Sequence, residues 1–229
     1  MPVIVFSSPK GGAGKTTAAT ILATELAGMG ASVTVIDADP NRNVVDWAEL
    51  PGVPDNLAVI WDTSEETIMD CIGDAACKSA FVIVDLEGAA SLLMSYAISM
   101  ADLVVIPVQG SQLDARQAAR QIDLINFICS SIPFAVVFTR TNPAITPKTQ
   151  RHIEARFAEL KVPVLQTKLY DREAYRAMFS YGGTLAGLEG KVSNLHAAIK
   201  NAHAFVSEVL WHLRAGQGSA ARIEAKEVA

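Results

Sequence analysis

The chain has 229 residues, of which 50% are hydrophobic and 19% are charged, and its formal net charge is −5. This composition excludes an intrinsically disordered chain, and the length suits a single domain with one substantial core. The acidic balance gives no general sign of nucleic-acid binding, so any DNA contact must come from a local basic patch. The three cysteines lack metal-ligand spacing and fit a reducing cytoplasm. No apolar run is long enough to cross a bilayer, and we expect no signal peptide.

Apolar runs alternate with segments of helical periodicity, which predicts an α/β fold with a doubly wound, mostly parallel sheet flanked by helices. The expected strands cover residues 3–7, 32–37, 57–61, 81–85, 103–108, 134–139 and 162–167. The expected helices between them cover residues 15–29, 65–76, 89–100, 115–130 and 147–160. A long amphipathic helix is expected over 192–213, within one domain over residues 1–214, and a flexible tail over 215–229.

The most informative segment is residues 10–17, Lys-Gly-Gly-Ala-Gly-Lys-Thr-Thr, which follows the apolar run 3–6. Its glycines let the backbone curl so that N–H groups converge on an anion, and the helix that opens at Lys15 adds the positive end of its dipole. Lys15 is expected to reach the β- and γ-phosphates of a nucleotide, and the Thr16 hydroxyl to hold Mg²⁺. The predicted nucleotide-binding residues here are Gly11, Gly12, Ala13, Gly14, Lys15, Thr16 and Thr17.

Three aspartates lie at the ends of two other predicted strands. Asp85 closes the apolar run 81–84, where a P-loop ATPase needs a carboxylate to organise Mg²⁺. Burying that carboxylate is costly without a strong partner, although a helix N-cap is an alternative role. Asp37 and Asp39 end the second strand before Pro40, and a capping turn explains one of them more easily than both.

The octet carries a second lysine, Lys10, and Pro9 stands where a standard P-loop has glycine. In both respects it resembles the deviant Walker A motif of the ParA/MinD ATPases. The resemblance implies ATP and Mg²⁺ as cofactors, with catalytic roles for Lys10, Lys15 and Asp39. In that family the extra lysine reaches the nucleotide of a second protomer. Asp39 would then orient or activate the attacking water, and the metal site would comprise Thr16, Asp37 and Asp85.

Two positions depart from the family pattern. Asn41 stands where relatives usually have glutamine, which leaves the rate of hydrolysis open. Glu87 follows the strand of Asp85 where relatives usually have small residues; pairing with Lys10, pairing with Arg116 and full solvation all remain open for it.

The segment Thr-Arg-Thr-Asn-Pro at 139–143 resembles the family's adenine-contacting loop. The resemblance assigns Arg140 and Asn142 to the base, although an ordinary turn uses the same residue types.

The resemblance implies a weak ATPase that closes a sandwich homodimer around ATP and then binds DNA without sequence preference. A small ParB-like centromere-binding partner would stimulate hydrolysis and so partition plasmid DNA, in the cytoplasm and on the nucleoid in the ATP state. The candidate phosphate-neutralising residues, each about as well explained as a solvated charge, are Arg116, Arg120, Arg151, Arg172 and Lys200.

Other functions of the same fold stay open. One is a ParA-like ATPase that positions a conjugative DNA-transfer complex or another cargo. Another is a MinD-like membrane cycler, but the mixed-charge C-terminal segment is poorly suited to lipid, so we expect no stable membrane association. A metabolic enzyme and a nucleotide-binding scaffold without turnover are the remaining alternatives.

Overall fold

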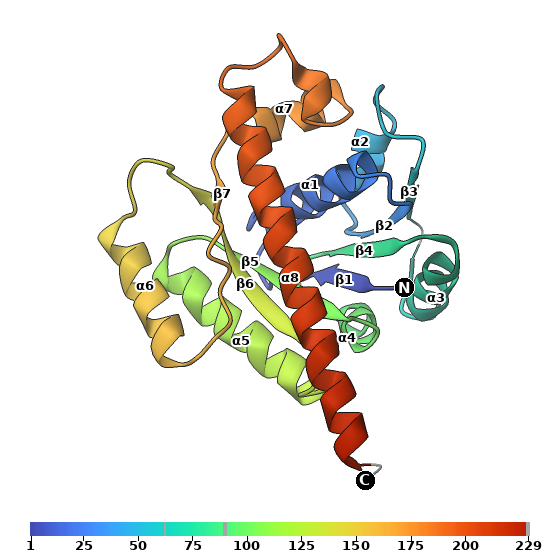
Figure 1. The fold of residues 1–229 in the computed structure, drawn as a ribbon, viewed down its shortest axis with the longest axis vertical. Coiled ribbons are helices and arrows are strands. Elements are labelled where there is room, and N and C mark those ends of the chain that lie inside the picture. Colours follow the sequence, from blue (N-terminus) through green and yellow to red (C-terminus); the bar gives the residue numbers. More distant parts are fainter. Residues whose placement is uncertain (62, 89–90, 228–229) are drawn as a thin grey trace.

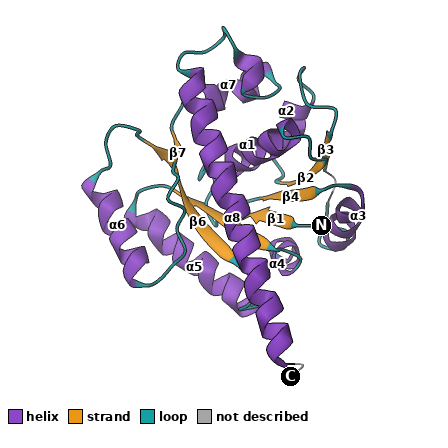
Figure 2. Cartoon of the chain, in the orientation of Figure 1, coloured by secondary structure: helices purple, strands orange, loops and turns teal. Residues whose placement is uncertain are grey.

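The computed structural model describes residues 1–61, 63–88 and 91–227, with residues 217–227 described by their backbone alone. Seven strands form one sheet in the order β3-β2-β4-β1-β5-β6-β7, and all neighbours are parallel. The strands are β1 (Val3–Phe6), β2 (Val33–Ala38), β3 (Leu57–Ile60), β4 (Phe81–Leu86), β5 (Leu103–Val108), β6 (Phe134–Thr141) and β7 (Leu169–Tyr170). This confirms the doubly wound parallel sheet predicted from the sequence (Figure 2).

Helices cover both faces of this sheet (Figure 1). One face packs against α1 (Lys15–Gly28), α2 (Asn43–Ala48), α7 (Glu173–Tyr181) and α8 (Leu195–Glu227). The other packs against α3 (Ile68–Lys78), α4 (Leu92–Ser99), α5 (Gln112–Ile128) and α6 (Lys148–Glu159). A short 3-10 turn, Ala186–Leu188, precedes α8.

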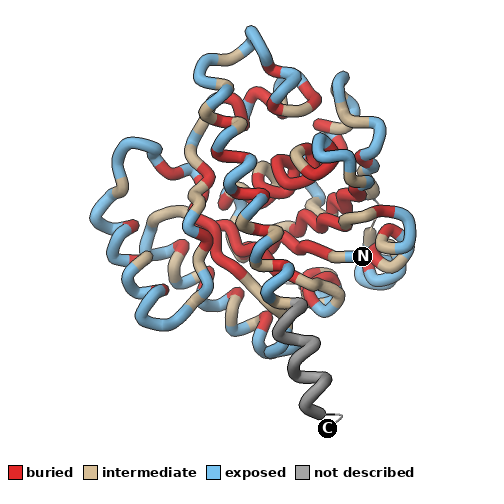
Figure 3. Tube along the Cα trace, in the orientation of Figure 1, coloured by how far each residue is buried: buried red, intermediate tan, exposed pale blue. Residues whose placement is uncertain are grey.

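The central strand β1 explains why its sequence reads as an unbroken apolar run. Ile4 and Phe6 belong to the core under α1 and α8, and Val3 and Val5 belong to the core on the opposite face. All four are buried, because a parallel strand in the middle of such a sheet is covered on both sides. Figure 3 shows the buried residues gathered along the strands and the helix faces that meet them.

The sheet also places the functional loops together. Phe6 at the end of β1 lies opposite Asp85 of β4 and Val105 of β5, and Asp37 of β2 also lies opposite Asp85. Since parallel strands share their carboxyl edge, the segments that follow β1, β2 and β4 leave the sheet side by side.

The prediction of a strand over 162–167 was wrong. There the structure has one isolated bridge, Val136 to Val164, and the last strand, β7, comes later, at Leu169–Tyr170. The carbonyl of Pro163 accepts from Val136 N at 2.8 Å, but proline has no N–H to donate, which limits ladder formation. The short helices α2 and α7 were not predicted.

The C-terminal helix is longer than the sequence indicated. We expected it over 192–213, but α8 runs from Leu195 to Glu227, so its backbone is helical through most of the expected tail. The division into a domain over 1–214 and a flexible tail over 215–229 stays a prediction. Within the described residues, none of the helices combines the length and the apolar character needed to span a bilayer.

Candidate functional site

The loop after β1 has the backbone of an anion cradle. Gly12 and Gly14 have φ values of 78° and 89°, a left-handed region that favours glycine, and Gly14 is the N-cap of α1. A Cβ added at Gly14 would lie 3.3 Å from the Cβ of Thr139, which leaves little space for a side chain. Both glycines are therefore required by the fold of the loop.

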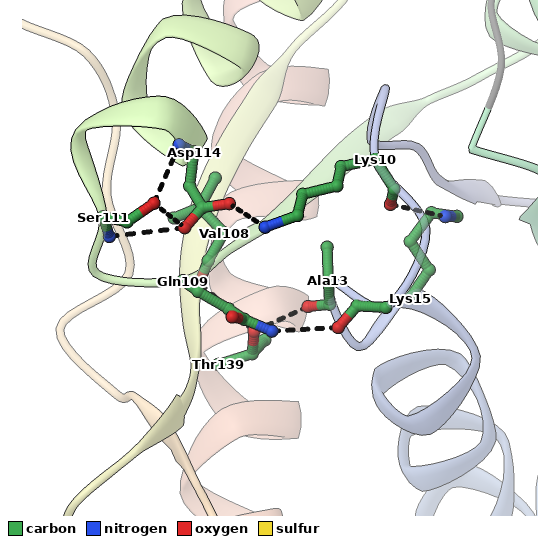
Figure 4. A network of polar contacts seen from close by, with 9 residues as sticks. Lys10, Ala13, Lys15, Val108, Gln109, Ser111, Asp114 and Thr139 are labelled. Carbon is green, nitrogen blue, oxygen red and sulfur yellow. Dashed lines mark hydrogen bonds and ion pairs between the residues drawn. The ribbon is translucent and has the colours of Figure 1, made fainter.

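Side chains from the neighbouring strands hold this loop in place (Figure 4). The Thr139 hydroxyl of β6 donates to the carbonyl of Ala13 at 2.6 Å and to that of Val108 at 3.1 Å. Gln109 Nε2 donates to the carbonyl of Gly12 at 2.9 Å. These contacts fix the loop by its carbonyl groups, an arrangement that suits a loop whose N–H groups bind an anion.

Lys15 is buried at the start of α1. It is 5% exposed, and its Nζ donates to the carbonyl of Lys10 at 3.4 Å. Burial lowers the pKa of Lys15, and the negative charges of Asp85, Asp39 and Glu87 oppose that change. A buried ammonium group surrounded by carboxylates and a curled backbone is suited to a phosphate group.

Lys10 points away from the loop toward α5 (Figure 4). Its Nζ forms an ion pair with Asp114 Oδ1 at 2.9 Å, and Asp114 is itself part of a capping box with Ser111. Burial alone would raise the pKa of Asp114, but hydrogen bonds from Ser111 and Lys10 outweigh it and leave the pKa below its usual range. In this conformation Lys10 is bound within its own chain.

Asp85 is the least satisfied polar group of the site. It is fully buried, and neither carboxylate oxygen has a hydrogen-bond partner among the described residues. Burial raises its pKa to about 7, while the adjacent Thr16 hydroxyl and the Lys15 charge oppose the rise. Buried polar atoms are nearly always paired, so an unpaired carboxylate indicates a missing ligand. A carboxylate and a hydroxyl beside a phosphate loop are ligand types that suit Mg²⁺ and its water shell.

Asp37 takes the capping role that the sequence left open for one of the two aspartates. Its Oδ2 accepts from Val44 N at 2.8 Å and Val45 N at 3.1 Å, and its Oδ1 accepts from Asp39 N at 3.2 Å. Burial raises the pKa of Asp37, and these hydrogen bonds oppose the rise. Asp37 therefore caps the unpredicted helix α2, and its role toward Mg²⁺ stays a prediction.

Asp39 lies at the edge of the cavity above the loop. Its Oδ1 accepts from the backbone N of Asn41 at 2.9 Å and from Asn41 Nδ2 at 2.8 Å. The residue that replaces the family's glutamine thus orients Asp39 directly. Sequence comparison alone could not have shown this contact.

Two adjoining cavities form the candidate ligand site. The first, of about 310 Å³, is lined by the phosphate loop, Asp39, Asn41 and Arg140. The second, of about 190 Å³, shares Gly14, Thr17 and Arg140 with the first and extends to Tyr170 and Arg176. The aromatic wall at Tyr170 was not among the predicted site residues.

Of the two residues that the resemblance assigns to the base, only Arg140 borders the two cavities. Arg140 lines both cavities and has a left-handed φ of 51°, at a register irregularity in β6. Asn142 lines neither cavity, and its Oδ1 accepts from Ala144 N at 2.8 Å and Ile145 N at 3.2 Å. Its side chain serves the ordinary turn that was the alternative reading.

The segment after β4 lies in contact with the phosphate loop. A Cβ at Gly88 would lie 2.7 Å from the backbone N of Gly11, so the two loops touch through their main chains. Glu87, next to it, makes no ion pair with Lys10 or Arg116 in the part of the chain that the structure describes. Lys10 pairs with Asp114 instead.

The predicted DNA-binding residues fall into separate places. Arg116 and Arg120 on α5 and Arg151 on α6 are exposed on adjacent helices of one face. Arg172 lines the smaller ligand cavity, and Lys200 lies on α8 across the sheet. The five therefore do not form one continuous surface on a single chain.

Comparison with known proteins agrees with this geometry. The family model described as VirC1 protein matches residues 1–206. The chain belongs to the VirC1 family. This VirC1-family chain is 44% identical over 213 residues to a protein named ParA from Rhizobium radiobacter, covering 91% of the chain and 96% of that relative. It is also 30% identical over 191 residues to a protein named virC1 from Rhizobium rhizogenes, covering 80% of the chain and 82% of the relative.

Among solved structures, McdA from Cyanothece shares the fold of this VirC1-family chain. The apo structure matches with a TM-score of 0.72 and 18% identity, covering 91% of the chain and 99% of the McdA chain. A McdA variant in complex with ATP matches with a TM-score of 0.69 and 18% identity, covering 91% and 96% of the two chains. Together the comparisons confirm the resemblance to the ParA/MinD superfamily.

Proposed function

We propose that this protein is an ATPase that binds ATP with Mg²⁺ over the loop of residues 10–17 and hydrolyses it slowly on its own. The observation that carries the proposal is the fully buried Asp85, unpaired among the described residues, beside a glycine-rich loop and a buried lysine. ATP bound to a variant of McdA, which has the same fold, supports the choice of nucleotide.

Each residue has a distinct task in this proposal. The loop N–H groups and Lys15 bind the β- and γ-phosphates, and Thr16 and Asp85 hold Mg²⁺. The ion, when bound, neutralises charge that develops on the transferred phosphoryl group. Asp39, held by Asn41, orients the attacking water. Tyr170 and Arg140 border the second cavity, which we assign to the nucleoside.

Phosphate release from ATP tests this function. The wild-type protein with Mg²⁺ is expected to release phosphate, and EDTA is expected to stop it. Asp39→Ala is expected to bind ATP but to release little phosphate, and Lys15→Ala to lose ATP binding. Arg156→Ala, which removes an exposed pair with Glu159 on α6, is the control and is expected to behave as the wild type. If the wild-type protein binds ATP but does not hydrolyse it, with or without DNA, the ATPase proposal is wrong and the protein is a nucleotide-binding scaffold.

We further propose that ATP closes a homodimer, that the dimer binds DNA without sequence preference, and that the protein partitions plasmid DNA. The relative named ParA, 44% identical over nearly its whole length, supports a ParA-type role. Closing the dimer would require Lys10 to leave Asp114 and reach the nucleotide of the second protomer. A ParB-like partner would stimulate hydrolysis, and the ATP state would gather on the nucleoid in the cytoplasm.

For DNA contact we propose the face that carries Arg116, Arg120 and Arg151. Replacing one phosphate-contacting arginine removes a contact from both protomers of the dimer, so it should reduce the slope of log affinity against log salt by about 2. Lys200→Ala, on the opposite face, is the matched control and is expected to leave the slope unchanged. Equal slopes for Arg120→Ala and the wild type would exclude this face.

A further inference from the structure

Arg42 and Trp61 join the ends of two neighbouring strands. The guanidinium carbon of Arg42 lies 3.7 Å from the centroid of the Trp61 ring, a distance at which the ring face attracts a cation. Arg42 follows β2 by a short turn, and Trp61 comes directly after β3. The buried Nε of Arg42 has no hydrogen-bond partner among the described residues, and the stack on Trp61 is the contact that those residues give the guanidinium.

Arg42 also closes the turn that carries Asp39. Its backbone N donates to the carbonyl of Asp39 at 2.9 Å, and its own carbonyl accepts from Asp46 N at 2.9 Å in the first turn of α2. The Asp39 carboxylate is held within the same turn by Asn41. A displacement of Arg42 therefore moves the backbone to which Asp39 is attached.

The backbone of Arg42 is in a conformation that favours glycine. Its φ and ψ are 54° and 35°, in the left-handed region that side chains with a Cβ rarely adopt. Such conformations persist where the surroundings impose them, and they gather at functional sites. Glycine would accept this backbone with less strain, so the Arg42 side chain is present at a conformational cost.

The position of Arg42 relative to the ligand cavities defines that use. Asp39 lines the 310 Å³ cavity of the phosphate loop, and it also lines a second space of about 250 Å³ that contains Arg42, Trp61 and Glu87. Arg42 does not line the cavity of the phosphate loop. Arg42 and Asp39 therefore border one shared space, and Arg42 does not border the cavity that we assign to the phosphates.

We propose that Arg42 is a positioning residue, whose stack on Trp61 holds the Asp39 turn in the conformation that hydrolysis requires. This inference rests on the proposed ATPase function, in which Asp39 orients the attacking water. The contact concerned is the stack of Arg42 on Trp61, and both residues belong to the described part of the chain.

The kinetic test compares Arg42→Gly, Trp61→Leu, Trp61→Phe and the double variant Arg42→Gly/Trp61→Leu. Misplacing a water-orienting group is expected to lower kcat about tenfold in Arg42→Gly and Trp61→Leu, with ATP affinity within about twofold of the wild type. Trp61→Phe keeps an aromatic face and is expected to restore most of kcat. The double variant is expected to be no slower than either single variant, since both remove the same contact.

A strain control separates the stack from the backbone effect. Lys161 has a left-handed φ of 55° at the end of α6 and lines none of the cavities above. Lys161→Gly is expected to keep the wild-type kcat, and both glycine variants should melt within about 3 °C of the wild type, because relief of strain offsets the lost contacts. A wild-type kcat in Arg42→Gly would overturn the inference. So would a normal kcat in Trp61→Leu beside a low one in Arg42→Gly, because Arg42 would then act without the stack.

Hydrogen exchange keeps the inference testable apart from hydrolysis. The amide of Arg42, which donates to Asp39, is expected to exchange faster in nucleotide-free Trp61→Leu than in the wild type or Trp61→Phe. Unchanged exchange in Trp61→Leu would overturn the positioning role whatever the protein hydrolyses. If exchange changes as expected while the wild type releases no phosphate, the proposed ATPase function fails and the stack is still shown to hold the turn.

Discussion

Asp85→Asn offers a quantitative test of the site, because it replaces a buried carboxyl group that has no hydrogen-bond partner among the described residues. Burial raises the pKa of Asp85 from an ordinary 3.8 to about 7. Between these two values the unfolded chain has already lost its proton and the folded chain still holds it. The contribution of Asp85 to the stability of the wild type must therefore fall as the pH rises through this range.

The expected size follows from the two pKa values. One pKa unit corresponds to about 1.4 kcal/mol, so the Asp85 carboxyl makes the wild type about 2–3 kcal/mol less stable at pH 8 than at pH 5. Asparagine has no such titration, and the cost of its unpaired amide, about 1–3 kcal/mol, is the same at both values. The stability of Asp85→Asn relative to the wild type should thus rise by about 2–3 kcal/mol between pH 5 and pH 8.

Urea unfolding of nucleotide-free protein at several pH values measures this difference directly. Carboxyl groups that do not interact with Asp85 titrate alike in both proteins, so their contributions cancel in the comparison. The reasoning would be refuted if the free energies of unfolding of the two proteins changed in parallel with pH. It would also be refuted if Asp85→Asn became less stable relative to the wild type between pH 5 and pH 8. Excess ATP with Mg²⁺ at about 100 times its Kd should add about 2.7 kcal/mol to the wild type and much less to the variant.

Three further predictions concern the phosphate loop and Lys10. Thr139→Val should lower the free energy of unfolding by about 1–3 kcal/mol in the urea assay and weaken ATP binding. Thr141→Val is the control: its buried hydroxyl has no partner among the described residues, so the free energy of unfolding should be unchanged or higher. Gly88→Ala should abolish ATP binding in calorimetry because its Cβ meets the loop backbone, and Gly73→Ala, in open space on α3, should bind normally. Lys10→Ala should bind ATP as a monomer yet fail to dimerise in sedimentation with ATP, and an ATP-dependent dimer of that variant would remove Lys10 from the interface.

The parts of the molecule governed by local pattern could be predicted from the sequence. The β1 strand, the glycine-rich loop and the start of α1 at Lys15 follow from an unbroken apolar run and from turn chemistry, and the structure has them at those positions. Asp85 lies near the end of β4 and next to the loop because parallel strands share one carboxyl edge, a consequence of the fold class itself.

Contacts between distant segments could not be predicted in the same way. Lys10 and Asp114 are 104 residues apart, and nothing in the residues around either one indicates the partner. The capping role of Asp37 depends on α2, whose six residues are too few for a clear helical period. The apolar residues of 162–167 indicated a buried segment, and we therefore expected a strand there. Pro163 has no N–H to donate, and the segment forms a single bridge instead.

The most direct test of the account is the binding of random-sequence DNA in the presence of ADP or of ATP with Mg²⁺, for the wild type, Lys10→Ala and Asp39→Ala. The account predicts salt-sensitive binding only with ATP, lost in Lys10→Ala and retained in Asp39→Ala, which holds ATP without hydrolysing it. DNA binding that is equal in all nucleotide states, or absent from a protein that hydrolyses ATP normally, would contradict a DNA-positioning switch.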